Sequence, residues 1–320
     1  MKSPAIDVSV ILVSYNTVGL LPNVVAALND ASAGLSVETI IIDNFSRDDS
    51  AKFIHDNFPD FQLIVNTENV GFGRANNQAL PLIHGKYVLL LNTDAFVAPD
   101  TLHKTLAYMD GHPECGALGV KLVGRDAVLQ PSCRYFPTPL NIFLQRTGLN
   151  RIMPWVRMID DMEWNHASVR VCDWVPGCYF LIRAAVIEQI GLFDPRYFLY
   201  YEEVDFCFSA IKSGWQIHYV PDTTVVHIGG ESAKSDGDIT SGGRQIEIIQ
   251  IESELLYFRK NHGASAVLLN VILHTVADLM IFLKELLKRK KKIGWRNHWE
   301  HIKLIWHVYI KTDFGISSIR

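Results

Sequence analysis

The stretch KYVLLLNTDAF, residues 86–96, determines how the rest of the sequence is interpreted. Tyr87 to Leu91 form an apolar run, which is typical of a strand buried on both faces of a sheet. Asn92, Thr93 and Asp94 follow directly. Because acids rarely enter a core without a partner, an acid at the end of a buried strand indicates a ligand site.

Similar apolar runs alternate with helical patterns through the first half of the chain. The predicted strands are Val8–Val13, Thr39–Ile42, Gln62–Val65 and Tyr87–Leu91, and the predicted helices are Leu20–Asn29, Asp49–Asn57 and Gly73–Ile83. Pro81 is expected to shorten the last of these helices. Continuous apolar strands separated by helices predict a parallel sheet with helices on both faces.

The second half is less regular. Its predicted elements are the strands Gly116–Val123, Cys178–Ile182 and Ile217–Val220 and the helices Leu102–Met109, Ala184–Ile190, Val204–Lys212 and Gln245–Asn261. Residues 124–170 indicate loops and short helices. Residues 229–244 are rich in glycine and charge, which predicts a loop able to close over a ligand.

The composition is that of a globular protein. The chain has 320 residues, 48% hydrophobic and 20% charged, enough for one large domain or for a domain with an appendage. The net charge of −4 gives no indication of a nucleic-acid partner. The five cysteines form no C-x-x-C pair, and no signal peptide is evident, so we expect reduced thiols and a cytoplasmic protein.

The C-terminal part differs from the rest in charge. Lys284 to Lys311 contains nine Lys/Arg and two Asp/Glu, a local charge of +7 that leaves −11 on the remainder. The preceding apolar stretch, Val267–Leu287, contains Asp278, which is costly inside a bilayer. We expect amphipathic helices over residues 263–320 that contact an anionic membrane peripherally; a helical hairpin packed on the main domain is the alternative.

Polar groups follow four of the predicted strands. They are Ser14-Tyr15-Asn16, Asp43-Asn44, the segment NVGFGRANN at 69–77, and Asn92-Thr93-Asp94. The carboxyl ends of parallel strands share one edge, where open α/β sheets bind ligands. GFGRAN lacks the position and spacing of a dinucleotide fingerprint, which disfavours an NAD-dependent oxidoreductase.

These motifs resemble, in order and spacing, the inverting glycosyltransferases of family 2. The resemblance is carried by VSVILVSYN, IIIDNFSRDDS, NVGFGRANNQA and YVLLLNTDA, and by PGCYFLIRAAVIEQIGLFDPRYFLYYEEVDF with the later TTVVHIGGES. It implies a GT-A (Rossmann-like) α/β domain over residues 1–262 with a mostly parallel sheet. Residues 1–123 would bind the nucleotide sugar and 124–262 would carry the acceptor and catalytic half.

The resemblance also implies a divalent cation, Mg²⁺ or Mn²⁺, beside the donor diphosphate. Asp94 is the expected ligand, with Asn92 where the family often has a first Asp, so we expect a weaker site. His227 matches a family ligand, although a lone His is more often a core residue. Nucleotide-sugar contacts are expected from Ser14, Tyr15, Asn16, Asp43, Gly71, Gly73, Arg74, Asn77, Asn92, Thr93 and Asp94. Among these, Asp43 would accept a hydrogen bond from a uracil or thymine ring.

The general base is expected in YYEEVDF. The family pattern Glu-Asp-x-Asp puts the base at the second acid, here Glu203, with Glu202 as the alternative and Asp205 as the third acid. An acidic helix N-terminus is the other interpretation. Trp174, Gly177 and Cys178 are expected on the acceptor side.

The implied activity is that of a metal-dependent hexosyltransferase. Within the family, the likeness is to bacterial rhamnosyltransferases of cell-surface polysaccharide synthesis, which suggests dTDP-rhamnose as donor and a lipid-linked saccharide as acceptor at the inner face of the membrane. The alternatives are a UDP-sugar-dependent transferase (galactosyl, glucosyl or N-acetylglucosaminyl) and a non-catalytic nucleotide-sugar-binding module. An oxidoreductase or a nucleotidyltransferase is the remaining rival.

Overall fold

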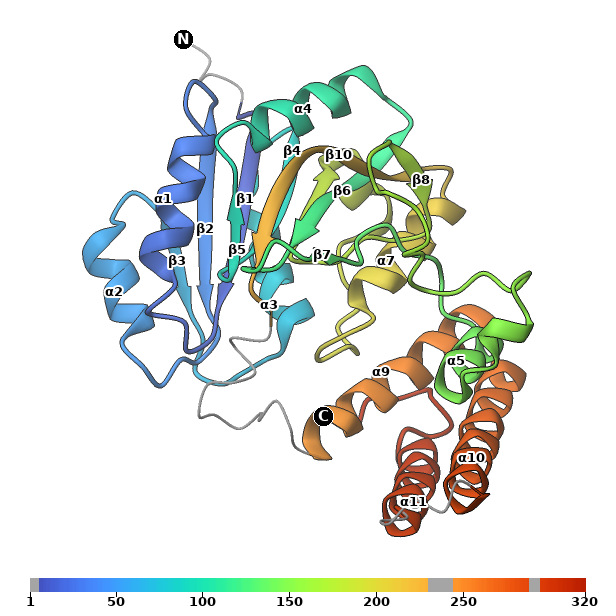
Figure 1. The fold of residues 1–320 in the computed structure, drawn as a ribbon. Coiled ribbons are helices and arrows are strands. Elements are labelled where there is room, and N and C mark those ends of the chain that lie inside the picture. Colours follow the sequence, from blue (N-terminus) through green and yellow to red (C-terminus); the bar gives the residue numbers. More distant parts are fainter. Residues whose placement is uncertain (1–5, 230–243, 288–293) are drawn as a thin grey trace.

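The fold is seen in a computed structural model, which describes residues 6–229, 244–287 and 294–320. The predicted loop at 229–244 and the basic run at 288–292 therefore lie almost wholly outside the described residues. A single twisted sheet forms the body of the molecule, with helices packed on both faces (Figure 1).

The first half of the sheet is parallel. Strands β1 (Val8–Ser14), β2 (Val37–Asp43), β3 (Gln62–Val65) and β4 (Tyr87–Asn92) stand in the order β3-β2-β1-β4. Helices α1 (Leu21–Ala31), α2 (Ser50–Asn57) and α3 (Phe72–Gln78) connect them. As Pro81 predicts, α3 ends early, and a short 3-10 turn, η1 (Leu80–Leu82), replaces its last part.

The second half of the sheet is mixed, which corrects the prediction of a mostly parallel sheet. Strand β9 (Tyr179–Arg183) runs antiparallel to both β4 and β6 (Cys115–Val123). Strand β10 (Gln216–His227) is parallel to β6 but antiparallel to β5 (Ala95–Val97) and to β8 (Arg170–Cys172). The two-residue strand β7 (Leu129–Gln130) pairs with β6.

The remaining elements are mostly helices. They are α4 (Thr101–Gly111), α5 (Pro139–Thr147), η2 (Leu149–Ile152), α6 (Ala184–Ile190), α7 (Glu202–Lys212), α9 (Arg244–His262), α10 (Ala264–Leu287) and α11 (Trp295–Lys311). Within the segment expected to hold loops and short helices, α5 begins with a capping box between Thr138 and Asn141.

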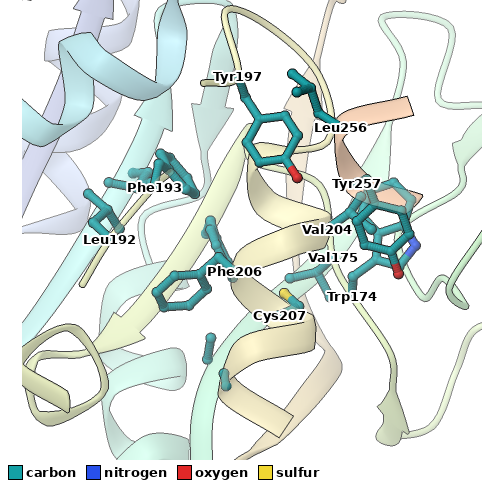
Figure 2. Close-up of a cluster of buried hydrophobic side chains, with 14 of the residues drawn as sticks. Trp174, Val175, Leu192, Phe193, Tyr197, Val204, Phe206, Cys207, Leu256 and Tyr257 are labelled. Atoms are coloured by element: carbon teal, nitrogen blue, oxygen red, sulfur yellow. The ribbon is translucent and has the colours of Figure 1, made fainter. Parts of the chain in front are cut away.

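Alternating side chains of the strands build two cores. On β1, Val8, Val10 and Leu12 pack under α1 and α4, whereas Ile11 belongs to the opposite core. That opposite core is centred on α7 and α9, where Val204, Phe206 and Cys207 meet Tyr197, Leu256 and Tyr257 (Figure 2). The α7 helix is therefore fixed by apolar packing along one side.

The C-terminal helices pack on the body through a polar seam. Glu254 of α9 accepts hydrogen bonds from Asn270 and His274 of α10 (2.6 and 2.9 Å) and from the Tyr201 hydroxyl (3.0 Å). Asp278 of α10 is buried and accepts from Arg146 of α5 at 3.0 Å. Figure 1 shows α5, α10 and α11 gathered around α9, beside the sheet domain.

The opposite face of α10 is exposed and apolar. It presents Leu268, Leu269, Ile272, Val276, Leu279, Met280, Leu283, Leu286 and Leu287. Trp295 and Trp299 of α11 are also exposed and border an apolar groove with Leu279 and Phe282. Helix α10 has the length and apolar character needed to cross a membrane, although a third of its most apolar window is buried inside the protein. One face of α10 therefore packs on the protein, as in the alternative of a packed helical hairpin. The other face points outward and is accessible to a membrane.

Candidate active site

The carboxyl ends of the parallel strands meet as the sequence predicts. In the register of the sheet, Ser14 of β1 lies opposite Asp43 of β2, and Val13 lies opposite Asn92 of β4. A pocket of about 380 Å³ opens at this edge. That volume lies within the range of small-molecule sites.

The pocket gathers side chains from both halves of the chain. Of the predicted residues, Tyr15, Asn92, Thr93, Asp94, Gly177, Cys178, Glu202, Glu203 and His227 line it. Residues outside the list of expected ligand contacts complete the lining: Val13, Asn44, Asn69, Phe72, Arg134, Pro176, Phe198, Leu199 and Tyr200.

Asp94 and His227 are brought together by the antiparallel pairing of β5 with β10, in which His227 lies opposite Ala95. The His227 Nε2 atom lies 3.5 Å from Asp94 Oδ1, while Asp94 Oδ2 accepts from the Gly229 N–H at 3.1 Å. Burial lowers the pKa of His227, and the charge of Asp94 opposes this only in part, so the imidazole is neutral near pH 7.

The tautomer of His227 follows from Gln130. The Gln130 Nε2 group donates to the His227 backbone oxygen (2.9 Å), which turns Gln130 Oε1 toward His227 Nδ1 (3.0 Å). The proton therefore resides on Nδ1, and the lone pair of Nε2 faces the Asp94 carboxylate. Two acceptors facing each other fit a shared cation, and a hydrogen-bonded Nδ1 is the usual support of a ligating His.

Within the described residues, no group of three or more His, Cys, Asp or Glu side chains is arranged to hold a metal. A cation held by Asp94 and His227 would complete its coordination with phosphate oxygens and water, as Mg²⁺ and Mn²⁺ commonly do.

Asp43 is a buried acid with an unused acceptor. Its Oδ2 atom accepts from the Ser46 N–H at 3.0 Å, but its Oδ1 atom is buried without a partner in the described protein. Burial raises the pKa of this carboxyl. An unpaired buried oxygen at the sheet edge fits a hydrogen bond from the N–H of a ligand ring.

Glu202 and Glu203 begin α7, after two residues with left-handed backbones, Tyr200 (φ 71°) and Tyr201 (φ 69°). Left-handed backbones are unfavourable for bulky residues and cluster at functional sites. The Oε2 atom of each glutamate is buried without a partner among the described residues. Burial raises the pKa of both carboxyls, and for Glu202 the neighbouring charge of Glu203 adds to it.

The two acids face different sides of the pocket. A Cβ on Gly73 of α3 would lie 3.7 Å from the Glu202 Cβ, so Glu202 lies under the donor half of the fold. A Cβ on Gly177, just before β9, would lie 4.0 Å from Glu203 Oε1. Glu203 therefore lies on the side formed by Gly177 and Cys178. Cys178 lines the pocket with Asp94 and Glu203, and burial together with the charges of these two acids raises the pKa of its thiol to about 12.

Comparison with known proteins shows which family this chain resembles. The sequence model of Glycosyl transferase family 2 matches residues 9–161. The N-acetylglucosaminyl-diphospho-decaprenol L-rhamnosyltransferase of Mycobacterium tuberculosis is 27% identical over 245 residues, which cover 71% of this chain and 78% of the relative. The chain is thus similar to the family 2 glycosyltransferases, whose sequence model matches just under half of it. The rhamnosyltransferase WbbL of Escherichia coli is 27% identical over 169 residues, 49% of this chain and 60% of WbbL.

A solved structure shows the same fold. The mannosyltransferase PcManGT from Pyrobaculum calidifontis, determined with GDP-Man and Mn²⁺, covers 98% of this chain and 91% of its own with a TM-score of 0.54. At 16% identity this likeness concerns the fold alone. The glycosyltransferase thus has the predicted GT-A architecture, followed by a C-terminal helical segment.

Several predicted residues of the enzyme support the pocket without lining it. Ser14 is buried and bonds the Thr17 hydroxyl (3.0 Å), and Asn16 accepts from the Arg47 N–H (2.6 Å). Gly71 has φ 86°, and a Cβ there would lie 2.4 Å from the Phe198 carbonyl oxygen. Gly71 therefore allows the two halves of the enzyme to approach closely.

Four other predicted residues, Arg74, Asn77, Trp174 and Asp205, do not line the pocket and make contacts elsewhere. Arg74 donates to the Pro195 carbonyl (2.6 Å) and Asn77 both donates to and accepts from the Phe193 backbone (2.7 and 3.0 Å), so neither reaches the pocket. Trp174 is buried, and its indole N–H donates to Tyr135 (2.9 Å). Asp205 accepts from Lys260 (2.6 Å) and Asn261 (2.7 Å), which makes it a link to α9.

Asn44 lines the pocket, although the sequence analysis noted it only as a polar strand end and did not include it among the expected ligand contacts. Its Nδ2 atom donates to Asn69 Oδ1 (2.9 Å), and its Oδ1 atom accepts from Asn66 Nδ2 (3.0 Å) and from the Val70 N–H (3.1 Å). These bonds shape the loop that enters α3. The signal was present in the sequence, because Asn44 adjoins Asp43 and Asn69 opens the next motif.

Proposed function

We propose that the enzyme transfers a hexose from a dTDP- or UDP-linked donor to a lipid-linked saccharide during cell-surface polysaccharide synthesis, with L-rhamnose as the leading donor sugar. The observation that carries the proposal is one pocket holding both the Asp94–His227 pair and the glutamates of α7. The names of the relatives support rhamnose, and one of those names includes a lipid diphosphate acceptor.

In this proposal the nucleotide occupies the side of the pocket formed by Tyr15, Asn44 and Asn69. The free Oδ1 atom of Asp43 accepts a hydrogen bond from the imide N–H of uracil or thymine. Asp94 and His227 would hold Mg²⁺ or Mn²⁺ next to the donor diphosphate. The cation would supply stabilisation of the charge that develops on the leaving diphosphate.

Glu203 serves as the general base. Its carboxylate lies on the Gly177 side, and its Oε2 atom has no protein partner that would compete for the acceptor hydroxyl. It would take the proton of that hydroxyl as the oxygen attacks the anomeric carbon. Attack from the face opposite the leaving diphosphate in a single displacement inverts the anomeric configuration.

The location proposed for the enzyme is the cytoplasmic face of a membrane. The outward face of α10, together with Trp295 and Trp299, would rest in the interface, and the sequence KRKKK at 288–292 would attract anionic lipid. A lipid-linked acceptor would then be met at the surface where it resides.

Turnover of a donor panel tests the proposal. dTDP-rhamnose, UDP-galactose, UDP-glucose and UDP-N-acetylglucosamine are incubated with the enzyme, a lipid-linked saccharide and either Mn²⁺, Mg²⁺ or EDTA. Release of nucleoside diphosphate with formation of a glycosylated lipid is expected for one donor, and only with metal. If no donor binds, is transferred or is slowly hydrolysed, the proposal is wrong.

A further inference from the structure

Arg134 lies where the acceptor half of the pocket meets the segment that leads to α5. Its backbone is fixed against Trp174: the Arg134 N–H donates to the Trp174 carbonyl (3.2 Å), and its carbonyl accepts from the Trp174 N–H (3.1 Å). The Arg134 side chain lines the pocket, as do Pro176, Gly177 and Glu203.

The guanidinium of Arg134 is held on two sides. Its Cζ atom lies 4.2 Å from the centre of the Trp174 ring, and its Nε donates to Asp160 Oδ1 at 2.6 Å. No described residue accepts a hydrogen bond from its Nη1 or Nη2 atoms, and a quarter of the side chain is exposed. The fork of two terminal nitrogens is therefore oriented in advance and available to a ligand.

Arg134 is the group in the pocket suited to an anionic part of a ligand. Asp94, Glu202 and Glu203 are acids, and Arg134 is the one Lys or Arg among the described residues that line the pocket. Planar, bidentate recognition by Arg suits phosphate. Arg134 is anchored on Trp174, two residues before Pro176 and three before Gly177, and its charge acts on Glu203, which associates it with the proposed acceptor side.

We propose that Arg134 binds the phosphate ester attached to the acceptor's reacting sugar. This inference rests on the proposed function and deepens it. With the sugar hydroxyl at Glu203, a phosphate on the same ring would lie toward the neighbouring Arg134. The chain beyond Arg134 enters α5, which is joined to α10 by the Arg146–Asp278 ion pair (3.0 Å).

Matched acceptors test the assignment. The same saccharide is supplied as an octyl glycoside and as an octyl diphosphate ester, and kcat/KM is measured for both with the wild type and Arg134→Gln. Loss of a charge-assisted bidentate contact is expected to reduce the preference for the diphosphate acceptor by about ten- to a hundredfold. Arg134→Lys should keep part of that preference. Arg151→Gln, at an exposed arginine in η2, is the control and should leave it unchanged.

Two results would overturn the assignment. An equal loss of kcat/KM for both acceptors in Arg134→Gln would mean that Arg134 only supports the shape of the site. A raised Kd for the donor nucleotide, measured by calorimetry without acceptor, would mean that Arg134 binds the donor diphosphate. Absence of transfer by the wild type would instead contradict the proposed function itself.

Discussion

Asp94 and His227 are far apart in the sequence, yet one strand pair brings them within 3.5 Å. The position of Asp94 could be predicted from the sequence, because Asp94 follows an apolar run that predicts a buried strand. Its closeness to His227 depends on β5, a three-residue strand that is too short to predict from periodicity. Arg134 was missed for a similar reason, since its place depends on backbone pairing with Trp174 across an irregular segment.

Substitutions at Asp94 and Asn92 should act in opposite directions on the metal site. Asp94→Asn removes the expected carboxylate ligand, so kcat should fall about a hundredfold or more at saturating Mn²⁺. Asn92→Asp adds a second carboxylate at the same edge and should lower the Mn²⁺ concentration required for half-maximal activity. Metal titrations of initial rates measure both effects, and Asp60→Asn at an exposed loop is the control. Full activity of Asp94→Asn in EDTA would contradict the metal role.

The pH dependence of kcat/KM should reflect the ionisation of the Glu203 carboxyl. Burial raises the pKa of its carboxyl above the ordinary value of 4.5, and nearby backbone N–H groups and the charge of Arg134 counter this in part. Because only the ionised form accepts a proton, kcat/KM should decline as pH falls through this raised pKa, giving an acid limb above pH 4.5.

Replacement of Glu203 tests the same role. Glu203→Gln should lower kcat by about 10²- to 10⁴-fold and leave the calorimetric affinity for the donor nucleotide nearly intact. Glu188→Gln, at an exposed position of α6, should leave kcat unchanged. If Glu202→Gln removes the acid limb and Glu203→Gln does not, the base is Glu202.

At the scale of elements, the strands and helices with strong apolar patterns were predicted to within a few residues, as for β3 and α6. Antiparallel β9 was predicted as a strand but not in direction, because a continuous apolar run does not encode orientation. Helix α7 begins at Glu202, two residues before the predicted start at Val204, and its N-cap is the left-handed Tyr201. The acids do occupy the first turn of the helix, as the alternative interpretation of an acidic helix N-terminus expects.

The loop before α3 gives a test at this scale. Gly71 combines φ 86° with a carbonyl oxygen 2.4 Å from where a Cβ would lie, so Gly71→Ala should lower the free energy of unfolding by about 2 kcal/mol or more. It should also weaken donor binding, because the loop shares Asn69 with the pocket. Gly19→Ala is the matched control, since nothing lies within 4 Å of its added Cβ. Thermal unfolding should separate the two variants, and similar melting temperatures would refute the strain argument.

At the scale of the whole molecule, the C-terminal helices add a polar face that packs on the body and an apolar face that points outward. The inward face of α10 carries Asn270, His274 and Asp278, and the outward face is apolar. The sequence showed both residue types but could not assign them to faces, because that requires knowing where α5, α9 and α11 lie.

Vesicle binding follows from this arrangement. The protein should co-sediment with vesicles containing phosphatidylglycerol, more weakly at high salt and with neutral vesicles. Leu269→Asp combined with Leu283→Asp should weaken binding at least about tenfold, because two exposed apolar contacts become charged. Val65→Asp, equally exposed on β3, is the control. Unchanged sedimentation of the double variant would exclude α10 as the contact surface.

The bond from Tyr201 to Glu254 has a practical consequence for any shortened form of the enzyme. Glu254 shares its oxygens between Tyr201, which precedes the proposed catalytic acids, and Asn270 and His274 of α10. Deleting residues 264–320 to obtain a vesicle-independent protein would strip Glu254 of its α10 donors and loosen the entry to α7. Such a truncated chain should therefore lose turnover even on an octyl glycoside in detergent-free buffer. A lower kcat measured there would mean that residues 264–320 support the proposed active site, whereas an unchanged kcat would contradict this role.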